Sequence, residues 1–260
     1  PGKLPIGITY DPSNGYLYVA NTVTGTLSII DPSTNKVIGN IHLIPYIRCI
    51  AYDPSNGYLY VTDYEANSVI VINPSTNHVT GIIKVGVRPT GIIYYPSNGY
   101  LYVTNRGSNT VSVIDPSINQ VIANIYVGKC PIRLTYDPSN GYIYVTDYGS
   151  NEVSVINPST DQVIGEIRVG SEPAGIVYDP SNGYLYVADS GSNMISVINP
   201  STDQVVANIA GGGIKVPFGI TYDSYDGYVY VANLCSNVVS VINPSTNKVV
   251  GSIAIGAVSC

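Results

Sequence analysis

The sequence predicts an all-β fold made of six copies of one four-stranded unit, and three observations support this prediction. First, the segment YDPSNGY at residues 10–16 returns, unchanged or nearly so, with its first Tyr at positions 52, 94, 136, 178 and 222. Second, the segment DPSTN at residues 31–35 returns with the same steps of 42, 42, 42, 42 and 44 residues. Third, the runs between these markers are rich in Val, Ile, Leu and Tyr and show no helical periodicity.

Each repeat divides into four strands joined by turns. In the third repeat we expect strands at residues 91–94, 100–104, 110–114 and 120–127. The segments between them contain Pro, which presets φ for a turn, and Asn and Gly, which tolerate positive φ. A parallel β-solenoid has shorter coils and a β-sandwich would not repeat six times, whereas a four-stranded unit of this length is typical of a propeller blade. The sequence therefore predicts an all-β six-bladed β-propeller, with four antiparallel strands per blade and about 42 residues per repeat.

We expect residues 1–260 to form a single β-propeller domain of six repeats, at approximately 1–43, 44–85, 86–127, 128–169, 170–211 and 212–260. No apolar run approaches the ~20 residues that a membrane-spanning helix needs. The net charge of −6 argues against a general nucleic-acid binder, which usually carries an excess of Lys and Arg. The chain starts without Met or a signal peptide, so we expect it to be processed or trimmed.

No set of residues with catalytic spacing stands out in the sequence. The two histidines are His42, in an expected outer strand, and His78, in an expected turn, and neither is placed to act as the base of a hydrolytic triad. Metal catalysis would need clustered His, Cys or carboxylate ligands, and the repeated turns lack the alternating ligands of a calcium loop. We therefore expect no enzymatic activity, no metal and no cofactor.

The loops that follow the second and fourth strands of each repeat vary most among the repeats. Since these loops share one end of each blade, that end is the better candidate for binding. Six of the 11 basic residues enter the first strands from this end, and three aromatic residues lie nearby. The candidate binding residues are Lys3, Arg48, Arg88, Lys129, Arg133, Lys215, Tyr46, Tyr64 and Phe218.

Two other recurrent residue types have both a structural and a functional interpretation. Ten of the 17 acidic residues lie in or beside the turns after the first and third strands, where Asp can cap a turn. Alternatively, these residues form an acidic surface that attracts cations or a second copy of the chain. Eighteen of the 24 Tyr occupy three positions per repeat, which indicates packing between blades rather than a stacking platform for carbohydrate or bases.

The four cysteines show no C-x-x-C spacing, so a zinc site is not expected. Cys235 lies in a loop of the sixth repeat and Cys260 ends the chain at the same end of that blade, so we predict a disulfide between them. A second pair, Cys49 with Cys130, is a weaker candidate because the two residues enter non-adjacent blades; buried thiols are the alternative.

The second strand of each repeat resembles a known family. Residues 102–105 read YVTN, and residues 18–21, 60–63, 144–147, 186–189 and 230–233 are close variants of it. Together with the flanking P-x-G-I-x-Y and S-V-I-[DN]-P motifs, the whole chain resembles the YVTN-repeat β-propeller family. That resemblance implies affinity with archaeal surface-layer-type and other secreted propeller proteins.

The sequence thus favours a non-enzymatic extracellular or cell-surface propeller that acts as a structural or protein-binding module and that could assemble into an array or filament. We expect a protein partner or self-association, no nucleic acid and no membrane span. A propeller that binds a small anion or glycan, or an enzyme that uses a basic channel mouth, is the alternative.

Overall fold

The structure, a computed structural model, describes residues 2–256, and within that range it contains strands, turns and loops but no helix. No described segment is therefore a helix that could cross a membrane. The strands form six antiparallel sheets of four, and each sheet follows the chain order of its strands. The prediction of an all-β six-bladed propeller is confirmed. The chain divides into two compact units, residues 1–125 and 126–260, which are described separately below.

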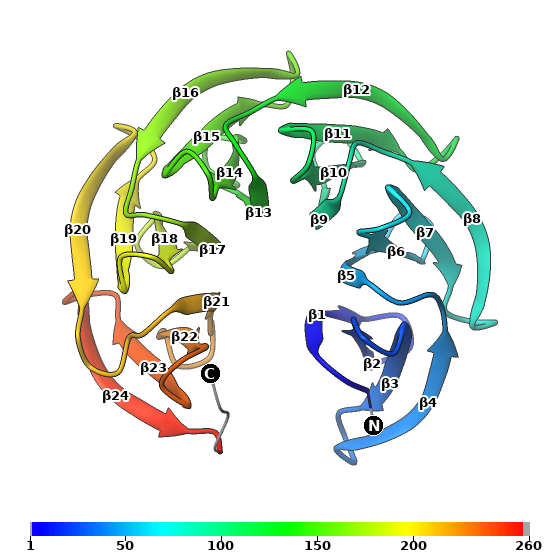
Figure 1. Cartoon of the computed structure of the whole chain (residues 1–260), viewed down its shortest axis with the longest axis horizontal. Coiled ribbons are helices and arrows are strands. Elements are labelled where there is room, and N and C mark those ends of the chain that lie inside the picture. The colour runs from blue at the N-terminus through cyan, green and yellow to red at the C-terminus, as the bar shows by residue number, and fades with distance from the viewer. Residues whose placement is uncertain (1, 257–260) are drawn as a thin grey trace. The chain divides into compact units, whose positions relative to one another are not determined.

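Unit 1 contains blades 1 to 3 (Figure 1). Blade 1 comprises β1 (Pro5–Asp11), β2 (Tyr16–Asn21), β3 (Thr26–Asp31) and β4 (Lys36–His42). Blade 2 comprises β5 (Ile47–Asp53), β6 (Tyr58–Asp63), β7 (Ser68–Asn73) and β8 (His78–Lys84). Blade 3 comprises β9 (Pro89–Tyr95), β10 (Tyr100–Asn105), β11 (Thr110–Asp115) and β12 (Gln120–Tyr126). The first strands of neighbouring blades, β1 with β5 and β5 with β9, contact each other.

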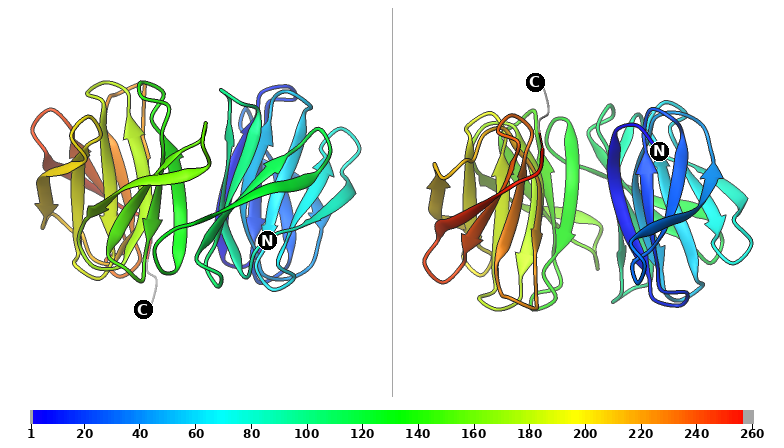
Figure 2. Two further views of the ribbon diagram at one scale, coloured as in Figure 1. Left: turned by 90° about the horizontal axis from the view of Figure 1, so that it is seen from above. Right: turned by 90° about the horizontal axis from the view of Figure 1, so that it is seen from below.

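Unit 2 contains blades 4 to 6. Blade 4 comprises β13 (Pro131–Tyr136), β14 (Ile143–Asp147), β15 (Glu152–Asn157) and β16 (Gln162–Arg168). Blade 5 comprises β17 (Pro173–Asp179), β18 (Tyr184–Asp189), β19 (Met194–Asn199) and β20 (Gln204–Ala210). Blade 6 comprises β21 (Pro217–Tyr222), β22 (Val229–Asn233), β23 (Val238–Asn243) and β24 (Lys248–Ala254). Figure 2 shows the strands of both units from the side, with the turns and loops at the two ends of the strands.

The hydrophobic cores lie between neighbouring blades. Between blades 1 and 2, for example, Leu27 of β3 and Ile47 of β5 belong to one buried cluster, and a second cluster between blades 2 and 3 contains Leu101 of β10. Blades 4 to 6 show the same arrangement. Blades 2 and 5 have a neighbouring blade on each face, and their second and third strands are buried at nearly every position. These strands therefore read as nearly continuous apolar runs rather than as strict alternations.

At one of the three recurrent positions, in the second strand, the tyrosines of five blades pack in the interior as predicted. Tyr18, Tyr60, Tyr102, Tyr144 and Tyr186 of the second strands are almost fully buried. Each hydroxyl accepts a hydrogen bond from the Asn side chain four residues earlier, at 2.8–3.0 Å; in blade 2 the pair is Asn56 and Tyr60. In blade 6 the partner position is Asp226, which accepts from the Tyr230 hydroxyl. The repeated turn Asn therefore supplies the polar partner that a buried Tyr needs.

The repeated aspartates cap turns, as the structural interpretation predicted. The Asp11 carboxylate accepts from the backbone N–H and the hydroxyl of Ser13, at 2.9 and 2.6 Å, and its counterparts in blades 2, 4 and 5 make the same bonds. These four carboxyl groups, on Asp11, Asp53, Asp137 and Asp179, are buried. They therefore contribute to turn geometry rather than to an exposed acidic surface.

The cysteines do not form the weaker of the two predicted disulfides. Cys49 packs in the core cluster between blades 2 and 3, and both Cys49 and Cys130 are thiols in the structure. The pairing of Cys49 with Cys130 was therefore wrong, because the Cys49 side chain belongs to a hydrophobic core rather than to a loop. The predicted pairing of Cys235 with Cys260 involves a residue outside the described range.

Candidate functional site

One loop position in every blade combines an unusual backbone conformation with a variable side chain. The residue just before each first strand has positive φ, between 49° and 72°, although none of the six is Gly. These residues are Leu4, Tyr46, Arg88, Cys130, Glu172 and Val216. Non-glycine residues adopt this region at a cost, so the surrounding structure must hold them there. We call this the display position, because six different side chains occupy it.

Backbone hydrogen bonds hold the display position in the same way whichever side chain it carries. In blade 3 the Arg88 N–H donates to Asn67 Oδ1 of blade 2 at 2.8 Å, and the Arg88 carbonyl accepts from the Arg106 N–H at 3.0 Å. In blade 5 the Glu172 N–H donates to Asn151 Oδ1 of blade 4 at 2.9 Å, and its carbonyl accepts from the Ser190 N–H at 3.0 Å. The position therefore joins the loops of two blades while its side chain is free to change.

In unit 1 the display position contributes to a cluster of two cations and one aromatic ring. The Arg48 guanidinium carbon lies 4.7 Å from the centroid of the Tyr64 ring, and that of Arg88 lies 5.6 Å from the same centroid. Arg48 comes from β5, Tyr64 from the β6–β7 loop and Arg88 from the residue before β9. The sequence predicted all three as binding residues, and the structure brings them together.

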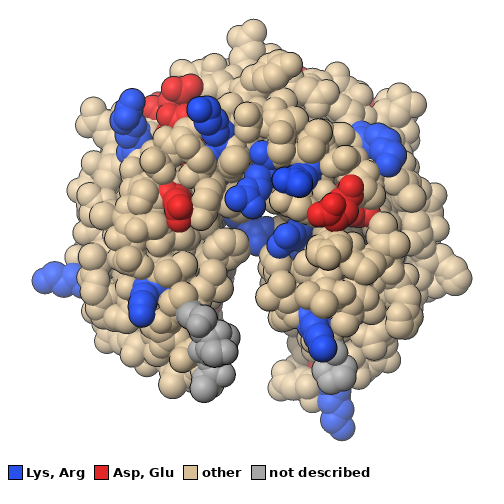
Figure 3. Space-filling view, in the orientation of Figure 1, with Lys and Arg blue, Asp and Glu red and all other residues tan. Residues whose placement is uncertain are grey.

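The two guanidinium groups give this cluster hydrogen-bond donors and positive charge. Cation–π contacts hold both guanidinium groups beside the ring, and each such contact is worth about 0.5–1 kcal/mol at an exposed site. Arg48 is half-buried, and its Nε is buried without a hydrogen-bond partner among the described residues. Figure 3 shows Lys and Arg side chains exposed on the face that it displays. A planar guanidinium matches a carboxylate, which it can bind in a bidentate manner.

The two other candidate binding residues of unit 1 are Tyr46 and Lys3. Tyr46, half-exposed, occupies the display position of blade 2, and its carbonyl accepts from the Tyr64 N–H at 3.2 Å, so it holds the loop that carries the ring. Lys3 is exposed, and its carbonyl accepts from the Val23 N–H at 3.2 Å.

Unit 2 places a different pair at the same repeat positions. The Tyr148 hydroxyl donates to Glu172 Oε2 at 2.8 Å, and these residues lie two repeats after Tyr64 and Arg88. Sequence reasoning did not select Tyr148 or Glu172, although aligning the repeats at the display position would have found them. Lys129 and Lys215 are exposed, whereas Arg133 and Phe218 are half-buried in β13 and β21. The Arg133 N–H donates to Thr146 Oγ1 at 3.1 Å.

Metal ligands and histidines are the other groups among the described residues that could form a functional site. Among residues 2–256, no group of three or more His, Cys, Asp or Glu is arranged to hold a metal ion. His42 and His78 are both exposed, and His78 Nδ1 lies 3.0 Å from the Thr76 carbonyl oxygen.

Comparison with solved structures shows likeness in fold. A chain of Kuenenia stuttgartiensis hydrazine synthase is similar with a TM-score of 0.82 and 23% identity, over 92% of this chain and 76% of that one. Because 1499 structure chains match this chain, the likeness indicates a widespread fold and selects no activity.

Sequence comparison gives the family. No curated protein matches the chain. A family profile described as a repeat of unknown function (DUF6923) matches residues 6–121 and 50–214, two overlapping stretches that together cover most of the six repeats. The chain therefore belongs to this family of repeats of unknown function.

Proposed function

We propose that this chain is a non-enzymatic, extracellular or cell-surface β-propeller that binds a protein partner through the loop end of unit 1. The observation that carries the proposal is the cluster of Arg48 and Arg88 at the Tyr64 ring. Tyr and Arg are enriched among the residues that dominate the energy of protein interfaces. The partner surface that fits this cluster carries Asp, Glu or a terminal carboxylate.

The repeat pattern is a second observation that supports this function. Turn residues are nearly constant in all repeats, while the display position carries six different side chains on a backbone that the loops hold in place. Such a scaffold allows binding residues to change at little cost in stability, as loops on rigid frameworks do. The YVTN-like segments are consistent with secreted and surface-layer-type propellers, in which a role in binding or assembly at the cell surface is expected. The neighbour titled hydrazine synthase is too distant in sequence to transfer an activity.

A labelled hexaglutamate peptide tests the proposal by fluorescence anisotropy. We expect it to bind in low salt and to weaken as salt rises, because exposed charge pairs are screened. The double variant Arg48→Glu with Arg88→Glu should lower the affinity by at least about tenfold. The double variant Lys36→Glu with Lys248→Glu makes the same change in net charge at two exposed residues that begin β4 and β24, and it should retain binding.

Equal losses in the two double variants would contradict a specific site, because they would show that net charge alone attracts the peptide. Inorganic phosphate is the second competitor. If it displaces the labelled peptide with an affinity equal to that of the unlabelled peptide, the small-anion alternative is favoured over a protein partner.

A further inference from the structure

A polar contact between the second and third strands occurs in five of the six blades. The last residue of the second strand is Asn or Asp, and it shares a hydrogen bond with a buried Ser of the third strand. The pairs are Asn21–Ser28 (3.0 Å), Asn105–Ser112 (2.9 Å), Asp147–Ser154 (2.6 Å), Asp189–Ser196 (2.6 Å) and Asn233–Ser240 (3.0 Å). In blades 1, 3 and 5 the Ser hydroxyl also donates to an Asn of the fourth strand.

Blade 2 has lost this polar contact. Its acid is Asp63, but the Ser position is Ile70 and the paired residue of the fourth strand is Ile82. Asp63 is only 1% exposed. Its Oδ1 accepts from the Ala66 N–H at 3.0 Å, and its Oδ2 is buried without a hydrogen-bond partner among the described residues. One oxygen of each equivalent acid, Asp147 and Asp189, is likewise buried without a hydrogen-bond partner among the described residues. Blade 2 differs because no Ser hydroxyl donates to its acid, so Asp63 lacks a hydrogen bond that the other buried acids have.

The loop above Asp63 also differs from its counterparts. Gly86, Gly128 and Gly170 lie directly on the Asn or Asp of their blades, and a Cβ at these positions would meet that side chain at 2.6–2.8 Å. In blade 2 the equivalent residue is Ile44, whose side chain cannot fit so close to Asp63. The loop of blade 2 therefore cannot approach its acid as closely as the glycine loops do, and Asp63 is buried by other neighbours.

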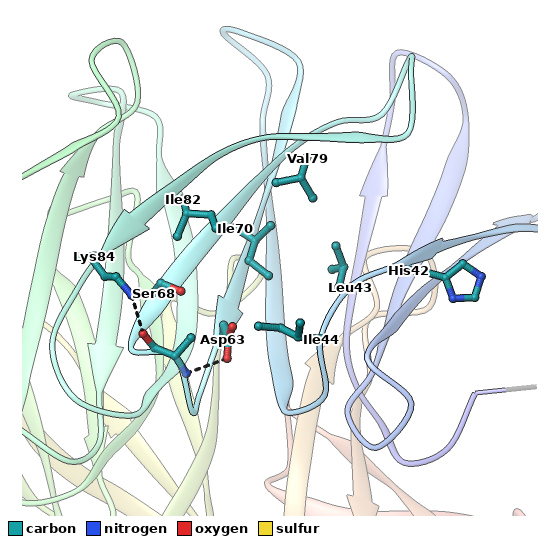
Figure 4. A pocket seen from close by; sticks show the side chains of 10 residues that line it. His42, Leu43, Ile44, Asp63, Ser68, Ile70, Val79, Ile82 and Lys84 are labelled. Carbon is teal, nitrogen blue, oxygen red and sulfur yellow. Dashed lines mark hydrogen bonds between the residues drawn. The ribbon is translucent and has the colours of Figure 1, made fainter.

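These three replacements surround a cavity of about 350 Å³ in unit 1. Its walls are mostly apolar, with Ile44, Ile70, Val79 and Ile82 among them, and Asp63 also lines it (Figure 4). Lys84, exposed at the edge, donates from Nζ to the Ala66 carbonyl at 3.1 Å. A volume of this size lies at the lower end of small-molecule sites, which combine apolar walls with few polar groups.

We propose that this cavity is a binding site for a small organic amine with an apolar body, whose ammonium group donates to the Asp63 carboxylate. An ammonium provides both the missing hydrogen bond and the opposite charge, and a charge-assisted bond is about twice as strong as a neutral one. The isoleucine and valine side chains cover the hydrocarbon part of the ligand. The site is independent of the Arg48, Tyr64 and Arg88 cluster, because it is lined by other residues.

Isothermal titration calorimetry with 2-phenylethylamine tests this site, with 2-phenylethanol and 3-phenylpropionate as analogues of the same body. We expect the amine to bind and the alcohol and carboxylate to bind at least about tenfold more weakly. Asp63→Asn should lower the affinity for the amine by about tenfold or more, and it should fold, since blades 1, 3 and 6 carry Asn at this position.

A second variant tests the site without substituting Asp63. Ile70→Ser with Ile82→Asn restores the polar residues of blades 1 and 3, so the Ser hydroxyl should occupy Asp63 Oδ2 and abolish amine binding while the melting temperature holds or rises. Ile122→Ser, at an exposed residue of β12, is the control and should leave binding unchanged. The proposal fails if the native chain does not bind the amine, if it prefers the carboxylate or binds the alcohol equally, or if either blade 2 variant keeps native affinity.

Discussion

The Tyr148 hydroxyl donates a 2.8 Å hydrogen bond to Glu172 Oε2, whereas the equivalent pair in unit 1 places the Arg88 guanidinium 5.6 Å from the Tyr64 ring. The same two repeat positions thus present a bound carboxylate in one unit and a cation in the other. The backbone at both display positions has φ of 55° and the same hydrogen bonds. Side-chain charge at this position is therefore separable from the fold.

Charge reversal at the display position should cost little stability. We expect Arg88→Glu to lower the free energy of unfolding by no more than about 1 kcal/mol, the worth of one exposed cation–π contact, since backbone groups hold the loop. Arg88→Val should cost about 1 kcal/mol more than Arg88→Glu, because a β-branched residue tolerates positive φ poorly. Urea denaturation measures both. Equal destabilisation by the two variants would mean that contacts of the Arg88 side chain, rather than its backbone, hold the loop.

Asp147 should make stability depend on pH. Burial raises the pKa of Asp147 to about 7; Glu152 adds to the rise, and a hydrogen bond from Ser154 opposes it. Since the unfolded pKa is near 3.9, the folded state holds the proton more tightly. Stability from this group is therefore complete below about pH 4 and is lost as pH rises toward 7.

Asp147→Asn should remove that dependence. Blades 1, 3 and 6 carry Asn at this position, so the change keeps a partner for Ser154. We expect the variant to be more stable than the native chain at pH 8, by an amount on the order of 1 kcal/mol or more, and the difference to shrink at pH 4. Melting curves across this range provide the measurement. A difference that does not vary with pH would exclude Asp147 as the titrating group.

Thr146 should contribute to the contact between blades 4 and 5. Its buried hydroxyl donates to the Ala174 carbonyl at 2.7 Å and accepts from the Arg133 N–H at 3.1 Å. Thr146→Val keeps the shape but leaves both backbone groups without this partner, so we expect a loss of about 1–3 kcal/mol. Thr221→Val, at an exposed residue of β21, is the control and should change stability by less than about 0.5 kcal/mol. Similar denaturation midpoints for both variants would argue against the bridge.

Two glycines of unit 2 at one repeat position should respond oppositely to alanine. A Cβ at Gly175 would lie 2.4 Å from the Phe218 carbonyl oxygen, whereas at Gly219 the nearest atom is the Ala232 Cβ at 3.5 Å. Gly175→Ala should therefore cost about 1–3 kcal/mol, because backbone must move. Gly219→Ala should be neutral or stabilising by up to about 1 kcal/mol, since Ala is the better strand residue. Thermal denaturation of both variants measures this difference. A Gly175→Ala variant with the melting temperature of the native chain would contradict this reasoning.

The sequence by itself determined the blade count, the four strands of each blade and the turn chemistry. This was possible because Pro, Asn, Gly and Asp act locally and recur in register. In blade 3 the predicted strands at 91–94 and 120–127 agree to within two residues with β9 (Pro89–Tyr95) and β12 (Gln120–Tyr126). The buried role of the second-strand tyrosines could also be read from their regular recurrence.

Only the tertiary structure decided which variable residues meet. Arg48, Tyr64 and Arg88 come from two blades, and their approach depends on how β5 packs beside β9. The same holds for Ile44, Asp63, Ile70 and Ile82, which are ordinary apolar and acidic residues in the sequence and form a cavity only because a loop and three strands converge. Side-chain proximity across blades is a property of packing, and local sequence rules do not encode it.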